Sequence, residues 1–274
     1  MFELELFAYT IAVMSIIAVT LWIASRIKRD VGIVDSFWSL MILAAGLCFL
    51  YFGDTALSER STLVLILLAI WSLRLAAHIS WRNWGQPEDT RYQTIRKNNE
   101  PHFEWKSLYI VFLLQAMLAA IVALPLMSIF GSSNAINILD LFAFTLWLIG
   151  MSFEVIGDMQ LARFKSSASN RGKVLNTGLW RYSRHPNYFG EFCIWWAFFL
   201  FAIASGHWWS IISPLLMTIL LLKVSGVSLL ESTITDRRPD YADYIRKTSA
   251  FFPWFPKEAT SREATSSNTN EALK

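Results

Sequence analysis

The segment RYSRHPNYFGE, residues 181–191, places two arginines, a histidine, an amide and a carboxylate directly before the apolar run FCIWWAFFLFAIASG. Asn187 and Glu191 are four residues apart, so on a helix they share a face, where an amide and a carboxylate can bind one ligand together. A carboxylate that is withdrawn from water stays ionised only with hydrogen-bond donors nearby. The pattern therefore predicts a ligand site at Asn187 and Glu191, flanked by Arg184, His185 and Tyr188.

A second group of charged residues precedes this segment. Glu154 and Asp158 are also four residues apart, and like charges on one helical face repel unless a cation, a hydroxyl-rich ligand or a raised pKa relieves them. Arg163 and Lys165 follow one turn later. Carboxylates that accept from ribose hydroxyls, next to cations that hold phosphate, are typical parts of a nucleotide site. A helix that simply ends at the membrane interface with ordinary flanking charges explains the same pattern and stays open.

The composition indicates the environment in which these residues work. Of 274 residues, 54% are hydrophobic and only 16% are charged, with 13 Trp and 20 Phe, whereas about a quarter of an ordinary soluble domain is charged. The chain therefore reads as a membrane protein. The first apolar segment lacks a small-residue cleavage site, so we expect a retained helix. Cys48 and Cys193 lie inside apolar runs and support neither a disulfide framework nor a metal site.

Transmembrane helices must position the polar residues, because lipid cannot satisfy free backbone groups. A span needs about 20 mostly apolar residues. Seven segments qualify, at residues 5–25, 33–52, 61–81, 108–129, 137–161, 188–205 and 208–230. We expect one all-α membrane domain over residues 1–257, with a disordered tail over residues 258–274.

The basic residues predict the orientation of this bundle of seven transmembrane helices. Of 24 Lys and Arg residues, 21 fall in alternate connections or in the C-terminal region. The positive-inside rule then places the N-terminus outside and the C-terminus in the cytoplasm. Arg60 is alone in a loop on the opposite side. The expected location is a membrane crossed several times, in a bacterium the inner membrane.

Ionisable residues inside the spans all fall in the predicted cytoplasmic half. Buried charges are costly in lipid and usually face the bundle interior, where they mark a site. Their convergence from five helices predicts a cavity open to the cytoplasm. For single members, snorkelling to the interface stays open as an alternative. The residues are Asp35, Arg74, His78, Glu154, Asp158, Glu191, Lys223 and Glu231.

The segment NTGLWRYSRHPNYFGE, residues 176–191, resembles the C-terminal domain of the steroid 5-alpha-reductase-like membrane proteins. The ending LLESTITDRRPDYADYIRKTSAFFPWFP resembles that of a bacterial sub-family long described as uncharacterised. The likeness is strong over residues 150–257 and weaker in VDSFWS and NWGQPEDTRY. Sterol reductases and membrane methyltransferases of isoprenylcysteine or phospholipid carry a similar Arg-His-Pro-Asn-Tyr segment, so the motif specifies a superfamily better than a reaction.

The resemblance implies that NADPH binds from the cytosol and that a hydrophobic enone is the hydride acceptor. It implies cofactor contacts for Asp158, Asn187, Glu191 and Asn83, with Lys165 in the place of a phosphate-binding arginine. Tyr241 and Tyr244 belong to the C-terminal stretch that closes over the site. The remaining predicted cofactor residues are Arg163, Lys173, Arg184, His185 and Tyr188.

The residues that polarise the substrate carbonyl differ from the steroid reductases, which use a glutamate on the second helix and a tyrosine on the third. Here the second helix offers Asp35, and the third reads AIWSLRLAAHISW without a tyrosine. Because a donor at the carbonyl oxygen stabilises the charge left by hydride addition, Arg74, His78 or Tyr92 must take this part. His185, next to Pro186, also fits a plain helix cap.

We therefore expect an NADPH-dependent membrane reductase of a carbon–carbon double bond conjugated to a carbonyl in a lipid or steroid-like substrate. Two alternatives stay open. One is a methyltransferase that uses S-adenosylmethionine, for which Glu231 is the suggestive residue. The other is a non-enzymatic protein whose polar cluster binds lipid headgroups. We expect no nucleic-acid partner, and the oligomeric state and the substrate are left open.

Overall fold

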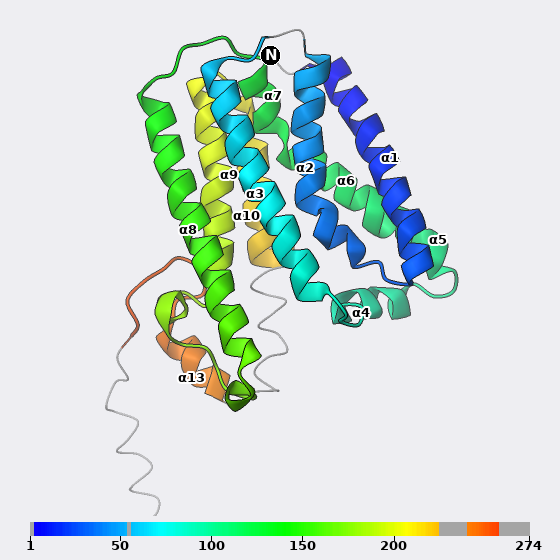
Figure 1. Ribbon diagram of the computed structural model, residues 1–274, viewed down its shortest axis with the longest axis vertical. Helices are drawn as coiled ribbons and strands as arrows, with labels where there is room; N and C mark the ends of the chain where they lie inside the picture. Colours follow the sequence, from blue (N-terminus) through cyan, green and yellow to red (C-terminus); the bar gives the residue numbers. More distant parts are fainter. Residues whose placement is uncertain (1–2, 54–55, 225–239, 258–274) are drawn as a thin grey trace, which may run out of the picture. The chain divides into compact units, whose positions relative to one another are not determined.

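A computed structural model describes residues 3–53, 56–224 and 240–257. Every regular element in these ranges is helical (Figure 1). The chain divides into two compact units: the first comprises residues 1–147 and 195–217, and the second comprises residues 148–194 and 218–274. The candidate catalytic residues belong to the first unit, and most of the candidate cofactor residues belong to the second.

Six helical segments in the described ranges are long and apolar enough to cross a membrane, which makes the chain a multi-pass membrane protein. They are α1 (Leu4–Lys28), α2 (Ile33–Phe52), α3 (Glu59–Asn83), the segment Phe103–Val122, α8 (Ile138–Ser166) and α9 (Pro186–Ala204). The segment predicted at residues 208–230 begins as an apolar helix, Trp209–Lys223, and its remainder lies outside the described residues. The count of seven and the sides of the termini stay predictions.

The fourth predicted span is interrupted. It comprises α5 (Phe103–Ser107), a π-helical stretch (Leu108–Leu113), α6 (Leu114–Val122) and α7 (Leu124–Phe130). The break at Ala123 comes two residues before Pro125. Proline has no N–H and its ring displaces the carbonyl of the preceding turn, so a continuous α-helix cannot run through this point. In the first unit α6 packs against α1 and α2, and α2 also packs against α3 and α7.

Arg60 was predicted to lie alone in a loop, but it is part of α3. It is the second residue of α3 and only 1% exposed, and its Nε lies 2.6 Å from Oδ1 of Asp140. Its other nitrogens donate to the carbonyls of Asn134 (3.0 Å) and Ala135 (2.7 Å). A buried ion pair is tolerated when such additional bonds satisfy it. Arg60 therefore ties the segment before α8 to the start of α3.

The second unit is built on a close contact between α8 and α9. A Cβ atom on Gly190 would lie 2.5 Å from the carbonyl oxygen of Gly150, and one on Gly150 would lie 2.6 Å from the carbonyl oxygen of Gly190. Only glycine permits two helix backbones to approach this closely. The helix α8 runs to Ser166, five residues beyond the predicted end. Glu154 and Asp158 lie within α8, as predicted, next to the first turns of α9.

Candidate functional site

In the first unit, Asp35 near the start of α2 is bound by two residues of α4 (Thr90–Asn98). Tyr92 donates its hydroxyl to Asp35 Oδ1 (2.6 Å), and Arg91 Nη2 donates to Asp35 Oδ2 (2.8 Å). Tyr92 is 5% exposed, and the Asp35 side chain is 19% exposed. The two carboxylate oxygens are thus each bound by a neighbour, while part of the carboxylate remains accessible.

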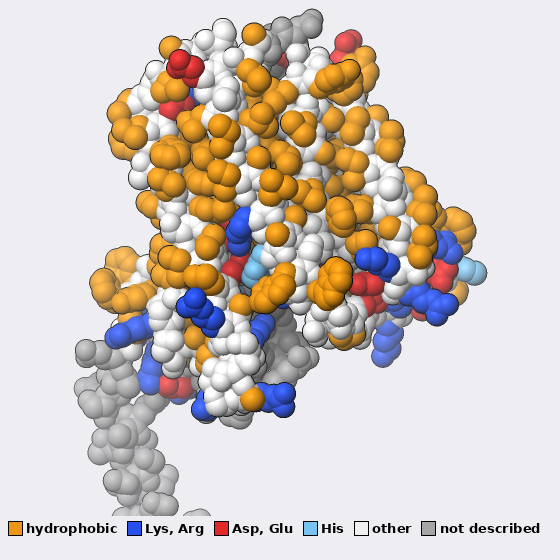
Figure 2. Space-filling view, in the orientation of Figure 1, with side chains coloured by type: hydrophobic (Ala, Val, Ile, Leu, Met, Phe, Trp, Pro, Cys, Tyr) orange, Lys and Arg blue, Asp and Glu red, His pale blue; other side chains and the backbone are white. Residues whose placement is uncertain are grey.

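The helix α4 is held in place by a set of local bonds. Asp89 caps its N-terminus by accepting from the Arg91 backbone N–H (2.8 Å), which satisfies an otherwise unpaired donor. Glu88 accepts from the Val31 backbone N–H (2.9 Å) and pairs with Arg96 (2.8 Å). The polar connection predicted over residues 82–107 therefore contains a short helix. Figure 2 shows charged side chains gathered around α4 and α5, below the hydrophobic surface of α1 and α2.

The electrostatics favour a protonated tyrosine in this cluster. Burial raises the pKa of Tyr92 well above its usual range, and the adjacent Asp35 carboxylate raises it further. Burial opposes the charge on Arg91, but Asp35 and Asp89 outweigh it and raise the pKa of that guanidinium. Tyr92 is consequently a neutral hydroxyl donor over the whole physiological pH range, oriented by a carboxylate.

The other residues predicted for the first unit lie along α3. Arg74 and His78 are half-buried, and the ring of His78 lies 6.1 Å from that of Trp81. Asn83 is the last residue of α3 and accepts from Arg82 Nε (3.1 Å). Among the four residues predicted for catalysis, Asp35 and Tyr92 are thus joined directly by a hydrogen bond.

In the second unit, the end of α8 and the start of α9 bring buried acidic groups together with an amide. Asn187 Nδ2 donates to Asp158 Oδ1 (3.1 Å). Glu154, Asp158 and Glu191 are all buried, with exposures of 3%, 9% and 7%. Two residues predicted to contact the cofactor, Asp158 and Asn187, are therefore in direct contact with each other. The group offers oxygen acceptors and an amide, a set that suits hydroxyl and carboxamide ligands.

The segment before α9 binds the C-terminal segment. Arg184 is 7% exposed, and its Nη1 donates to the carbonyls of Ile245 (3.1 Å) and Thr248 (2.6 Å). Its backbone N–H donates to Ser249 (2.9 Å), and Ser183 Oγ donates to the carbonyl of Phe251 (2.7 Å). Arg184 was predicted as a cofactor residue. In the structure its side chain binds backbone carbonyls at the end of α13 (Asp240–Lys247) and just after it.

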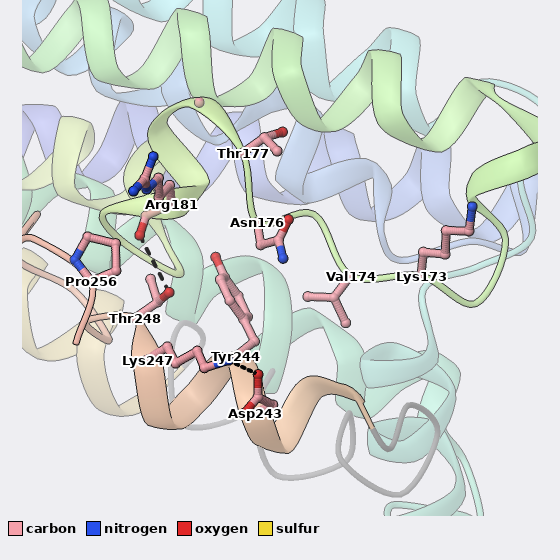
Figure 3. Close-up of a pocket in the computed structure, with 11 residues that line it drawn as sticks. Lys173, Val174, Asn176, Thr177, Arg181, Asp243, Tyr244, Lys247, Thr248 and Pro256 are labelled. Atoms are coloured by element: carbon pink, nitrogen blue, oxygen red, sulfur yellow. Dashed lines mark hydrogen bonds and ion pairs between the residues drawn. The ribbon is translucent and has the colours of Figure 1, made fainter. Parts of the chain in front are cut away.

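An open cleft of about 840 Å³ lies between residues 173–181 and α13. Figure 3 shows Tyr244 of α13 pointing toward the loop that carries Asn176 and Arg181. Lys173 and Tyr244 were predicted as cofactor residues, whereas Arg181 and Lys247, which also line the cleft, were not. A hydrogen bond from Lys247, together with its charge and that of Arg246, holds the pKa of Asp243 below its usual range.

The remaining predicted residues lie around these groups. Arg163 and Lys165 are exposed in the last turn of α8. His185 is buried, stacks on Tyr188 with ring centroids 5.5 Å apart, and precedes the first residue of α9. Tyr241 is buried, with its ring 5.5 Å from that of Tyr244. Glu231, on which the methyltransferase alternative depended, lies outside the described residues.

Besides the cleft residues Arg181 and Lys247, two contributors to these groups were missed in the sequence. Arg91 binds Asp35, and Ser183 binds the C-terminal segment. The run Glu88-Asp89-Thr90-Arg91-Tyr92 does carry a signal, since Asp before Thr-Arg is typical of a helix cap. No comparable signal marks Ser183, whose partner is a backbone carbonyl 68 residues away.

The fold and these polar groups define a multi-pass helical membrane protein with polar sites at the ends of its spans. The chain belongs to the family described as "Protein of unknown function (DUF1295)", which matches residues 21–248. That family is related to the steroid 5-alpha-reductase-like membrane proteins. A fission yeast relative, "Uncharacterized protein C594.04c" of Schizosaccharomyces pombe, is 29% identical over 263 residues that cover 85% of this chain and 75% of the relative. No solved structure matches the chain.

Proposed function

We propose that this protein is an NADPH-dependent reductase that acts on a carbon–carbon double bond conjugated to a carbonyl in a hydrophobic substrate. The observation that carries the proposal is the hydrogen bond between Tyr92 and Asp35 (2.6 Å). The third helix lacks a tyrosine, and α4 instead presents one to the carboxylate on α2. This pair supplies the acid and the hydroxyl group that the reductase chemistry requires.

The chemistry explains why a neutral tyrosine suits the role. Addition of hydride to the β-carbon of an enone leaves negative charge on the carbonyl oxygen, and a preorganised hydroxyl donor stabilises this charge. Burial and Asp35 keep the Tyr92 hydroxyl protonated. Asp35 accepts from that hydroxyl in the structure, and Arg91 donates to the other oxygen of the same carboxylate. A substrate carbonyl would have to accept this single hydroxyl proton in place of Asp35, so the Tyr92 O–H must turn from the carboxylate to the carbonyl oxygen when the substrate binds.

The residues of the second unit fit the parts of a dinucleotide. NADPH supplies a hydride when bound. Asp158, Asn187 and Glu191 suit its ribose hydroxyls and carboxamide, because they combine acceptors with an amide donor. The exposed cations Arg163, Lys165 and Lys173 suit its phosphates.

The experiment compares Y92F with the control Y51F in detergent-purified protein. Tyr51 is 83% exposed near the end of α2, whereas Asp35 is near its start. Y51F therefore removes the same kind of hydroxyl group at a position far along the helix from Asp35. Substrate turnover is followed as loss of nicotinamide absorbance with a panel of hydrophobic enones. We expect Y92F to bind NADPH within about twofold of wild type while its turnover falls roughly 10²- to 10³-fold, the typical effect of losing one such donor. Equal turnover of Y92F and Y51F would contradict the assignment of Tyr92.

Cofactor selectivity provides a second test. If the cations serve the 2′-phosphate, NADPH should bind more tightly than NADH by about 1.5–3 kcal/mol, the value of a charge-assisted hydrogen bond. The preference should shrink with added salt because these cations are exposed. Equal affinities at low salt argue against this role of the cations. Titration with S-adenosylmethionine separates the methyltransferase alternative, and binding of neither compound favours the lipid-binding alternative.

The proposal includes the predicted topology of seven spans with the C-terminus in the cytoplasm, in a bacterium across the inner membrane. A reporter fused after Pro256 should report the cytoplasm, and a reporter inserted in residues 130–136 should report the opposite side. Both reporters on one side would remove the argument for a cytosolic cofactor.

A further inference from the structure

Three large aromatic side chains project from the segment that follows α13. In FFPWFP, residues 251–256, Phe251 is buried at 5% exposure, whereas Phe252, Trp254 and Phe255 are 57%, 72% and 76% exposed. Exposed aromatic groups this close together are costly in water and usually mark an interaction surface. We call these three side chains the aromatic patch.

The patch belongs to a backbone that is held in place. The Trp254 N–H donates to the carbonyl of Tyr182 (2.9 Å), and the Lys257 N–H donates to the carbonyl of Lys247 (2.9 Å). The carbonyl of Phe251 accepts from Ser183 Oγ (2.7 Å). These bonds lie on both sides of the patch. The rings therefore project from an ordered segment and keep a defined direction.

The position of the patch is set by its contacts with α9. The ring of Phe252 lies 6.0 Å from that of Phe189 and 5.6 Å from that of Phe192. Both partners lie in the first two turns of α9, which is apolar enough to cross a membrane. The patch thus lies beside the first turns of α9, a helix long and apolar enough to cross a membrane.

We propose that the aromatic patch inserts into the interfacial region of the bilayer and anchors the C-terminal segment to the membrane. Tryptophan and other aromatic rings accumulate at this depth, where apolar area is buried among the headgroups. The exposed Lys257 directly after the patch suits anionic headgroups. The patch continues from the half-buried rings of Phe189 and Phe192 on α9, and the occupant of this surface is the bilayer. Membrane anchoring of this segment does not depend on the proposed reductase function.

The test places a nitroxide label on the full chain in lipid nanodiscs. Phe255→Cys carries the probe in the patch, and Ala242→Cys, exposed on α13, is the matched control. Both native cysteines are buried, at 8% and 2% exposure for Cys48 and Cys193, and unsubstituted protein measures their residual labelling. Collision with oxygen, which concentrates in lipid, is compared with collision with a water-soluble nickel complex.

We expect the label at position 255 to collide preferentially with oxygen and the label at position 242 with nickel. A bimane label at position 255 should also be quenched by brominated lipids, and the label at position 242 should not. Equal nickel access at the two positions overturns the proposal, because the patch would then lie in water. Protection of position 255 from both reagents also overturns it, because a protein surface would then cover the patch. If Phe255→Cys does not fold, Trp254→Cys is read with the same criteria.

Discussion

Replacement of Arg184 by glutamine tests whether this arginine fastens the C-terminal segment. In the structure its Nη1 donates to the carbonyls of Ile245 and Thr248, at 3.1 and 2.6 Å. Both acceptors are at the end of α13 or just beyond it. Glutamine is shorter and uncharged, so R184Q removes the charge-assisted bonds while the backbone bond from residue 184 to Ser249 can persist.

The expected size of the effect follows from these two bonds. A hydrogen bond to a charged group contributes about 1.5–3 kcal/mol, and two bonds from one nitrogen add incompletely. We therefore expect the free energy of local opening of residues 240–257 to fall by about 2–4 kcal/mol. This corresponds to a roughly 30- to 700-fold larger opening constant. The decrease cannot exceed the free energy that opening of residues 240–257 requires in the unsubstituted protein.

Hydrogen exchange read by mass spectrometry on peptides of residues 240–257 measures this opening. The matched control is R181Q, three residues earlier in the same motif, where the side chain is exposed. R181Q should change exchange of the segment by less than about twofold, since an exposed side chain contributes little. Peptides of α3 should exchange equally in both variants. If R184Q and R181Q give the same exchange over residues 240–257, the assignment of Arg184 as a fastener is wrong.

Three further predictions concern packing and charge. G190A should destabilise the protein by about 1–3 kcal/mol, the usual effect of overpacking. G157A should destabilise it less, because the nearest backbone atom would lie 3.2 Å from a Cβ at Gly157 but 2.5 Å from a Cβ at Gly190. Thermal unfolding in detergent compares the two variants. R60M should cost about 3–5 kcal/mol by leaving the Asp140 carboxylate buried without its partner, and the double variant R60M/D140L should recover much of this loss in the same assay. Burial raises the pKa of Asp89, but hydrogen bonds from Arg91 and its charge lower it overall below 3.8. The cap therefore stabilises α4 above pH 3.8 and loses this effect as the pH falls through the lower folded-state value; pepsin cleavage between residues 84 and 102 should then increase relative to D89N, which does not titrate.

Local pattern was enough to place most of the membrane helices. The predicted span 33–52 coincides with α2, because a run of apolar residues between polar connections leaves few alternatives in lipid. The end of α8 was predicted at residue 161, five residues too early. Hydropathy ends the span before Arg163 and Lys165, whereas the helix continues through both residues, which are exposed in its last turn.

The contacts within the candidate sites were less accessible from the sequence. Asp35 and Tyr92 were both candidates, but their hydrogen bond joins residues 57 positions apart and depends on how α4 folds back onto α2. The pairing of Arg60 with Asp140 spans 80 positions. Such pairs follow from tertiary packing and leave no periodic signal along the chain. The partner of Arg184 could not be predicted either, because an arginine binds a phosphate ligand as readily as a set of backbone carbonyls.

The loop before α9 binds the main chain of the C-terminal segment at three carbonyl groups. Arg184 and Ser183 bind the carbonyls of Ile245, Thr248 and Phe251, and every one of these groups is present whatever side chain the residue carries. These bonds should consequently tolerate substitution of Ile245 and Ser249, whereas insertion or deletion of a single residue between 245 and 251 would shift all the carbonyls out of register. Thr248 and Phe251 are more restricted, because their buried side chains contact the Arg181 carbonyl and the rings of α9.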